Sequence, residues 1–490
     1  MSDPDSQAPA GTRVAIIGAG FGGIAAAVAL QKAGIRDVVI FEKSSGVGGT
    51  WWDNRYPGAA TDAASHIYSF SFAPRDWARS HVGHAELRGY LDSVVDEFGL
   101  RPKLRVATGV KDLAWDEARK LWRLTTESGE SEAFTAVVSA VGMFGKPNWP
   151  KWPGLESFAG PVLHTARWDE SVDLRSKRVA VVGTGSSAAQ VVPALADQVK
   201  QLTLFQRQPG WLLPKSDRDF SERERALLRN PLLRRLYRLK LYLAQELREW
   251  NGAFFRPENR QNQKARQAAL AYLDTVFADR PDLKAVLTPD YPFMGKRLLI
   301  SSDFYPALRK PNVRLVPRAV ASCTPSGLVD VDGEHHEADA IALCTGFEVT
   351  DYLFSLRVTG RTGKTLSQTW NGVAEAFLGM MVPGFPNFFM IYGPGTNGGF
   401  IVTNLEWQAR FAALEIARIA GGKAGSVEVT QEASDAYNRW LQGRIAGTAF
   451  IAGKNYFKTA SGQIVTQWPD NATQYALKMA LTRRFARWRR

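Results

Sequence analysis

The chain has 490 residues, of which 45% are hydrophobic, a length and composition typical of a globular protein with two or three domains. No apolar run is long enough to cross a membrane, the N-terminus does not resemble a signal peptide, and two cysteines argue against a disulfide framework and fit a cytoplasmic location. The formal net charge is +13, but basic residues gather at 207–267 and at the C-terminus without forming a nucleic-acid-binding module, so we expect no nucleic-acid partner.

We expect residues 1–12 to form a disordered leader, and the pattern of residues 13–42 predicts one complete β-α-β unit. An apolar strand runs into a glycine turn, an Ala-rich helix follows, and a second strand delivers Glu42. Such a turn lets a pyrophosphate approach the backbone at the helix N-terminus, where the helix dipole favours negative charge. Glu42 would accept hydrogen bonds from ribose hydroxyls and repel a 2′-phosphate. The residues assigned to this site are Gly18, Gly20, Phe21, Gly22, Gly23, Glu42 and Lys43.

A segment dense in glycine and aromatic residues follows at 46–70. A plain surface loop would expose much apolar area at Trp51, Trp52 and Tyr56, so we expect these side chains to wall a flat ligand. Asp62 lies among small and aromatic residues, where a buried acid must be paired or shifted in pKa. A turn or helix cap is the alternative role of Asp62.

One amphipathic helix and short strands are predicted next, at 84–98, 105–110, 122–126 and 134–142. The last strand ends at Gly142, where we expect a second approach of the chain to the dinucleotide. The Pro- and Trp-rich stretch 145–154 then favours an extended linker and a domain boundary.

A second β-α-β unit at 177–207 repeats the spacing of the first with the opposite charge at its end. Glu42 follows Gly18 by 24 residues, and Arg207 follows Gly183 by the same 24. An arginine at this position suits bidentate hydrogen bonds to a 2′-phosphate, with a solvated strand-end cation as the alternative. The first unit is therefore predicted to bind FAD and the second NADPH, which implies hydride transfer from nicotinamide to flavin.

These units predict an α/β fold with two Rossmann-like dinucleotide-binding domains, one for FAD and one for NADP, and a helical insertion in the NADP domain. The first part of the FAD domain is expected at 13–150. The remaining parts are a linker at 151–176, the NADP domain at 177–345 with its insertion at about 215–290, and the second part of the FAD domain with the C-terminal region at 346–490.

Two cysteines 21 residues apart, outside any CxxC-like motif, argue against a dithiol reductase and leave oxygen activation by the reduced flavin. Residues 158–169 resemble the FxGxxxHxxxW(P/D) fingerprint of the type I Baeyer-Villiger monooxygenases at every fixed position, and 48–62 resembles the family's second signature, (A/G)GxWxxxx(F/Y)P(G/M)xxxD. The resemblance covers nearly the whole chain and is weakest at 215–290 and after 410. The fingerprint residues are Phe158, Gly160, His164, Trp168 and Asp169.

The resemblance implies an NADPH- and oxygen-dependent flavoprotein that converts ketones to esters or lactones through a flavin C4a-peroxide, with sulfides as further candidate substrates. It implies that Arg297, oriented by Asp62, stabilises the peroxide and the oxyanion of the adduct, and that His164 acts through domain linkage. A structural ion pair is the alternative for Arg297. The flavin would contact Gly49, Thr50, Trp51, Asp62, Tyr68, Val110 and Arg297. NADPH would contact Gly183, Thr184, Gly185, Ser186, Ser187, Ala188, Gln190, Arg207, Gln208 and Lys296, and no metal site is expected.

The insertion contains a basic amphipathic stretch, LLRRLYRLKLYLAQELREW, which we interpret as a solvated helix face covering the NADPH domain. We therefore expect no membrane association. Buried strands ending near the cofactors are expected at 339–347 and 388–400, the second opening into a Gly-rich turn. A helix at 403–419 is predicted to begin with Thr403 as its cap.

Two departures from the family pattern bear on specificity. Gln208 stands where many relatives have Thr or Ser, which predicts a weaker preference for NADPH over NADH, and Tyr456 stands where the family has a cofactor-contacting Trp. The alternatives are a flavin-containing monooxygenase that oxidises nitrogen or sulfur, and a non-catalytic sensor that binds FAD and NADPH. The expected partners are a small ketone and O2, in a monomer or weak oligomer.

Overall fold

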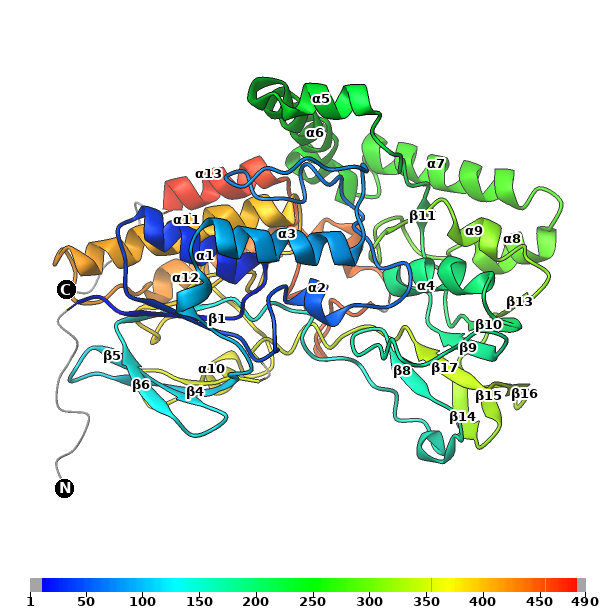
Figure 1. Ribbon diagram of the computed structural model, residues 1–490, viewed down its shortest axis with the longest axis horizontal. Helices are drawn as coiled ribbons and strands as arrows, with labels where there is room; N and C mark the ends of the chain where they lie inside the picture. Colours follow the sequence, from blue (N-terminus) through cyan, green and yellow to red (C-terminus); the bar gives the residue numbers. More distant parts are fainter. Residues whose placement is uncertain (1–10, 354, 454, 483–490) are drawn as a thin grey trace.

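The computed structural model describes residues 11–353, 355–453 and 455–482, so most of the predicted leader at 1–12 lies outside the described residues. Two five-stranded parallel sheets form the centres of two lobes (Figure 1). The first sheet has the order β19 (Phe388–Met390), β7 (Ala136–Ser139), β1 (Val14–Ile17), β2 (Val38–Phe41), β3 (Leu104–Arg105). The second has the order β13 (Val313–Val316), β10 (Gln201–Phe205), β9 (Arg178–Val182), β17 (Ala340–Leu343), β8 (Val162–His164).

Helices cover one face of each large sheet and an antiparallel or mixed sheet covers the other. In the first lobe the helices are α1 (Phe21–Lys32), α2 (Thr50–Asp53), α3 (His84–Glu97), α11 (Ile401–Ala420), α12 (Gln431–Ala446) and α13 (Ala472–Thr482). The mixed sheet consists of β4 (Val110–Asp116), β5 (Leu121–Thr126), β6 (Ser131–Phe134) and β18 (Arg357–Thr359), and α10 (Leu366–Trp370) packs beside β18. In and around the second lobe the helices are α4 (Ser186–Ala196), α5 (Glu222–Arg229), α6 (Pro231–Glu249), α7 (Arg260–Val276), α8 (Pro281–Leu287) and α9 (Phe304–Ala307). The antiparallel sheet consists of β14 (Val320–Thr324), β15 (Gly327–Asp330) and β16 (His335–Glu337), and β11 (Leu212–Leu213) and β12 (Leu299–Ile300) form a separate parallel pair.

Strand alternation explains this layering. Val14 and Ile16 of β1 share a core with α1 and α11, whereas Ala15 and Ile17 share one with β4 and β5. Successive side chains of a strand point to opposite faces, so a fully apolar strand is buried on both sides. In the second lobe β9 behaves in the same way, with alternate residues in the core that includes α4 and in the core under β14 and β15.

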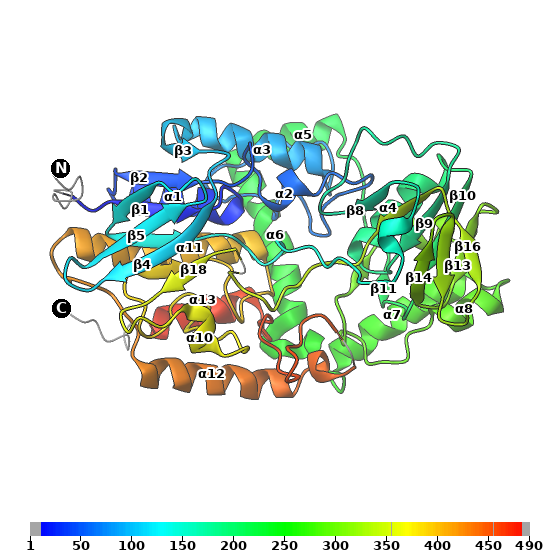
Figure 2. The same cartoon turned by 90° about the horizontal axis from the view of Figure 1, so that it is seen from below.

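Two segments that connect the lobes lie side by side, one before β8 and one after β17. Pro147 pairs with Phe347 in a β-bridge, and the backbone N–H of Asn148 donates to the carbonyl of Gly346 at 2.9 Å. Figure 2 shows both segments running across the gap between the sheets. The predicted linker therefore forms one of two adjacent connections, and the other follows β17.

Three predictions of element boundaries are wrong. The strand expected at 105–110 is divided, because β3 ends at Arg105 beside β2, residues 106–109 form a turn and loop, and β4 begins at Val110 beside β5. The strand expected at 134–142 is divided, because β6 pairs with β5 and ends at Phe134 while β7 joins the large sheet and ends at Ser139, before Gly142. The helix expected at 403–419 begins at Ile401, and Thr403 lies inside its first turn, where it does not cap the helix.

The insertion forms the predicted helices, but α6 does not cover the second lobe as expected. Its Leu241 and Tyr242 pack against first-lobe residues in a small core with Phe400. The Glu246 carboxylate accepts the backbone N–H groups of Ala472 and Thr473, both at 3.0 Å, and so caps α13. The sequence indicated that α6 has two different faces but not which of them is buried. We expected the outward face to be polar and solvated, but the face turned outward is rich in leucine.

Candidate functional site

A cavity of about 1280 Å³ lies between the two lobes and is lined by the turns at the carboxyl ends of both parallel sheets. This is the edge at which parallel α/β sheets bind ligands. Most of the predicted cofactor residues line it, including both glycine turns, Glu42, Val110, Arg207 and the pair Lys296 and Arg297. The expected strand ends contribute as well, through Gly142, Gly346 and the turn at 391–400.

The first glycine turn is shaped by close backbone contacts. Gly18 has φ +102°, and a Cβ on Gly23 would lie 1.8 Å from the Gly18 carbonyl oxygen. Helix α1 then begins without a side-chain cap or an acidic residue in its first turn. Its first N–H groups are therefore available to an anion in the cavity, which fits a dinucleotide diphosphate.

Glu42 ends β2 and is buried at the edge of the cavity. One carboxylate oxygen accepts the backbone N–H of Ala19 at 2.7 Å, and the other accepts that of Ser44 at 2.8 Å. Hydrogen bonds from N–H groups to a carboxylate are stronger than those between neutral groups. The loop therefore fixes the carboxylate in place beside the turn that precedes α1.

The second turn repeats this geometry. Gly183 has φ +114°, with its Cβ position 2.4 Å from the Cys344 carbonyl oxygen, and α4 begins after Gly185, again without a side-chain cap. Thr184 donates its hydroxyl to the carbonyl of Gln208 at 2.9 Å, which ties the turn to the end of β10. Ala188 is fully buried in the third small position.

Two cations meet at the end of β10. Arg207 is exposed, and Lys296 donates to the side-chain carbonyl of Gln208, whose amide in turn donates to Asp290 at 2.7 Å. Burial, reinforced by the charge of Arg207, lowers the pKa of Lys296 to about 8. An anionic phosphate would offset both effects, so this corner fits the 2′-phosphate of NADPH.

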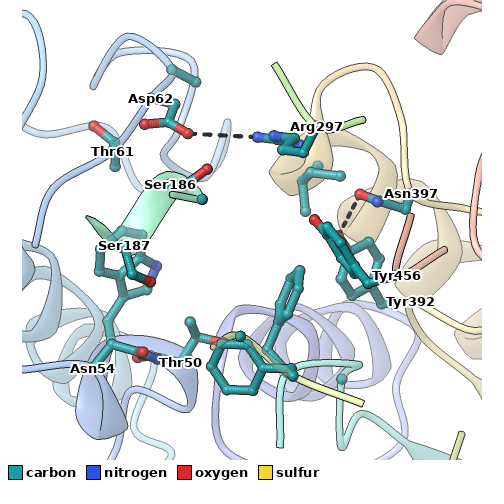
Figure 3. A pocket seen from close by; sticks show the side chains of 18 of the residues that line it. Thr50, Asn54, Thr61, Asp62, Ser186, Ser187, Arg297, Tyr392, Asn397 and Tyr456 are labelled. Carbon is teal, nitrogen blue, oxygen red and sulfur yellow. Dashed lines mark hydrogen bonds and ion pairs between the residues drawn. The ribbon is translucent and has the colours of Figure 1, made fainter. Parts of the chain in front are cut away.

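The structure brings together Asp62 and Arg297, 235 residues apart in sequence, across the cavity (Figure 3). The distance between Asp62 Oδ2 and Arg297 Nη2 is 3.7 Å. Burial raises the pKa of Asp62, and the positive charges of Arg297 and Lys215 oppose this rise. The side chain of Arg297 is about half exposed, 49%, to the cavity and holds a permanent charge there.

Aromatic residues of the predicted signature segment divide between cavity and surface. Trp51 lines the cavity and packs edge-on against Tyr68, with ring centroids 5.7 Å apart. Trp52 does not line it; its ring lies against the guanidinium groups of Arg55, at 4.6 Å, and Arg88, at 5.1 Å. The expectation that Trp52 walls a ligand is therefore wrong, because the short helix α2 turns adjacent residues to different sides.

The fingerprint residues lie outside the cavity, around β8. His164 is fully buried at the end of β8, with its ring near Trp149 at 5.2 Å and Phe347 at 6.2 Å, aromatic residues of the two connecting segments. Burial lowers the pKa of His164 to about 4, so the imidazole is neutral. The other four residues, Phe158, Gly160, Trp168 and Asp169, also do not line the cavity.

Among the cavity residues that had no individual assignment from the sequence, Tyr392, Asn397 and Glu249 carry polar groups. The Tyr392 hydroxyl donates to Asn397 at 2.8 Å, and Tyr392 has the rare positive φ of 63°, a strain that tends to occur at functional sites. Both lie in the Gly-rich segment that the sequence placed beside the flavin. Glu249, at the end of α6, is buried against the cavity, where burial raises its pKa to about 7. No motif in the insertion could have indicated it.

Two dinucleotide sites at one cavity define a class of nucleotide-dependent oxidoreductases, and comparison with known proteins agrees with this class. A model of the pyridine nucleotide-disulphide oxidoreductase family matches residues 15–251. A Baeyer-Villiger monooxygenase of Streptomyces coelicolor is 42% identical over 470 residues, 94% of this chain and 90% of the relative. One from Pseudomonas aeruginosa is 38% identical over 491 residues, 99% of this chain and 92% of the relative. The crystal structure of cyclohexanone monooxygenase from Rhodococcus sp. Phi1 bound to NADP+ has a TM-score of 0.87 at 28% identity, covering 98% of this chain and 100% of that one.

The chain belongs to the Baeyer-Villiger monooxygenases. The predicted family, the α/β fold with two Rossmann-like units, the monooxygenase activity and the cofactors FAD and NADPH are thereby confirmed. Disulfide chemistry, which the family model's description mentions, does not fit: Cys323 and Cys344 are free and buried, and burial raises the pKa of Cys323 to about 11.

Proposed function

We propose that Arg297 and Asp62 are the catalytic pair of a ketone oxidation that yields esters or lactones. When bound, FAD reduced by NADPH supplies the oxygen-activating chemistry. The observation that carries the proposal is the ion pair at 3.7 Å inside the cavity that both dinucleotide turns line. A structural ion pair would have no reason to leave its guanidinium half exposed to a shared cofactor cavity.

The residues divide between two binding tasks. We assign FAD to the N-terminus of α1 and to Glu42, with Thr50, Trp51 and Tyr68 against the flavin. NADPH is assigned to the N-terminus of α4, Arg207 and Lys296, with Gln208 holding the Lys296 ammonium beside Arg207. Two cations in one corner favour a 2′-phosphate, so we expect NADPH to be preferred over NADH even with Gln208 in this position.

Arg297 would act on the substrate through its charge. Attack on a ketone carbonyl converts its oxygen into an oxyanion, and a guanidinium fixed nearby stabilises the transition state more than the neutral ketone. Asp62 orients the guanidinium through the ion pair at 3.7 Å. Removing one such stabilising donor costs roughly 10²–10³-fold in rate in other enzymes.

The domain division at 13–150, 151–176, 177–345 and 346–490 is part of the proposal, as are a cytoplasmic location and a monomer or weak oligomer. The domain division is supported by the composition of the first sheet, in which β1, β2, β3 and β7 come from residues 13–150 and β19 comes from residues 346–490. The linker contributes β8 to the second sheet, which ties the fingerprint to the NADP-binding lobe.

The test is a ketone panel read by NADPH oxidation and product mass, comparing the native enzyme with Arg297→Ala. We expect the variant to reduce its flavin but to form no ester. Ester formation at the native rate would remove Arg297 from the mechanism. Oxidation of sulfides or amines without any ketone turnover would favour the nitrogen- and sulfur-oxidising alternative, and absence of substrate-dependent NADPH consumption would favour the sensor.

A further inference from the structure

The outward face of α6 carries a continuous row of exposed apolar side chains. Successive members are three or four residues apart, the spacing that places side chains on one side of a helix. At a rise of 1.5 Å per residue, the part of the row on α6 is about 23 Å long, and its last member, Trp250, follows the end of the helix. We call the row the leucine stripe: Leu232, Leu236, Leu239, Leu243, Leu247 and Trp250, with exposed fractions of 64%, 53%, 49%, 47%, 70% and 53%.

The stripe lies on a helix that is firmly anchored from its other side. The inner face caps α13 through Glu246, bonds Thr473 through the Tyr242 hydroxyl at 2.8 Å, and lines the cavity with Leu241 and Gln245. Figure 1 shows α6 with α5 on a ridge that projects from the body, and Figure 2 shows α6 running across the molecule. Its outward face is therefore a fixed, convex, apolar surface.

The exposed charges of α6 itself are all positive. Arg235 and Lys240 are exposed on either side of the stripe, whereas Arg248 lies toward the cavity and pairs with Glu249 at 3.4 Å. The two acids of α6, Glu246 and Glu249, are both buried on the inner face. Pairing of this helix with a second copy would bring basic side chains against basic side chains with no exposed acid of α6 to offset them. An anionic surface complements the same pattern.

We propose that the leucine stripe docks on the surface of an anionic lipid bilayer. The leucines and Trp250 enter the boundary between headgroups and acyl chains, and Arg235 and Lys240 reach the headgroup phosphates with their charged ends. No helix of the described ranges has the length and apolarity needed to cross a bilayer, so the contact is peripheral. This goes against the expectation of no membrane association drawn from the sequence. Because α6 also lines the cavity, docking would hold the site next to the bilayer.

The experiment is flotation of the FAD-loaded enzyme with vesicles of phosphatidylcholine alone or with phosphatidylglycerol at one third. We expect binding to the anionic vesicles, little to the zwitterionic ones, and weakening by salt. Leu236→Glu/Leu243→Glu is expected to reduce the partition coefficient at least about tenfold, since each change removes apolar area and adds a repelled charge. Arg235→Glu/Lys240→Glu should weaken binding to anionic vesicles as well.

A matched control is Val331→Glu, which places the same charge at a 57% exposed apolar position in the turn between β15 and β16 and should bind like the native enzyme. Flavin absorbance and NADPH oxidation report folding of every variant. Absent binding of the native enzyme to anionic vesicles, equal binding to zwitterionic ones, or native binding by the stripe variant would overturn the proposal. So would a native dimer that the stripe variant converts to a monomer, because a second copy would then cover the stripe.

Discussion

At the carboxyl edge of the first sheet, Glu42 is buried and both its oxygens are held by backbone N–H groups. At the matching position of the second sheet, Arg207 is exposed. The neighbouring Lys296 donates to the side chain of Gln208, the residue that follows Arg207. The two corners follow turns of the same spacing. They differ in the sign of the charge and also in how rigidly that charge is held.

This difference separates two kinds of cofactor. A buried acceptor fixed by its own loop suits a dinucleotide that stays in place, whereas an exposed pair of cations suits one that exchanges in each turnover. We infer that burial of the corner, beyond its charge, distinguishes the resident FAD from the exchanging NADPH. Each of the following changes acts on one corner and leaves the other as its control.

The largest effect is expected from Gly23→Ala. Its Cβ would lie 1.8 Å from the Gly18 carbonyl oxygen, so the first turn would have to move, at a cost of about 3 kcal/mol, the upper end of the usual cost of overpacking, which corresponds to roughly 100-fold weaker FAD binding. Ala188→Gly is the matched control, because the second turn already holds alanine there. Fluorescence titration of the apoprotein with FAD measures both, and native FAD affinity in Gly23→Ala would contradict the account.

Reversing the second corner should be the next largest change. Arg207→Glu replaces an attraction for the 2′-phosphate by a repulsion, so we expect the KM for NADPH in flavin reduction to rise by roughly 10–100-fold, from a charge-assisted bond worth about 1.5–3 kcal/mol. The KM for NADH should change little, and FAD should stay bound. An equal rise in the KM values for NADPH and NADH would show that Arg207 does not bind the 2′-phosphate.

Lys296 gives the second corner a pH dependence. We propose that its ammonium binds the 2′-phosphate, and its pKa in the free enzyme is lowered to about 8 by burial and by Arg207. Binding raises this pKa, so NADPH affinity is full below pH 8 and falls above it, by at most about tenfold per pH unit. Kinetics from pH 7 to 9.5 measure this fall. In Lys296→Met, and with NADH in the native enzyme, the fall should vanish; its persistence in Lys296→Met would assign it to another group.

Glu42→Gln should have the smallest effect. The amide keeps one acceptor for the Ala19 or Ser44 N–H group but loses the charge and the second acceptor. Weakening of one charge-assisted bond predicts a loss of about 1–2 kcal/mol in FAD binding, with NADPH affinity unchanged. Equilibrium FAD binding measured beside Glu42→Ala, which removes both acceptors and should lose more, tests this. Equal losses in the two variants would mean that the acceptor kept by glutamine contributes nothing to FAD binding.

Local sequence patterns were enough to predict the centre of the site. The strand, glycine turn and helix of each unit are encoded within thirty residues, and the corner charges follow at a fixed offset. Asp62 and Arg297 were brought together only by the family resemblance, since nothing local connects residues 235 apart.

Features that depend on tertiary contacts could not be read in this way. Trp52 turns away from the cavity because α2 is a single helical turn, and Thr403 loses its capping role because α11 starts two residues earlier. The buried face of α6 is the one with Glu246, since that acid caps a helix more than 200 residues later. The periodicity of the sequence alone favours burial of the leucine face, whereas in the folded protein these leucines are exposed.

The assignment of one cofactor to each corner is tested most directly by calorimetric titration of the apoprotein with FAD and with 2′,5′-ADP, which carries the 2′-phosphate without the nicotinamide. We expect each chain to bind one FAD and one 2′,5′-ADP. Arg207→Ala should bind FAD but not 2′,5′-ADP, and Glu42→Ala should bind 2′,5′-ADP but FAD only weakly. Competition of both ligands for a single site, or loss of both in either variant, would contradict the account.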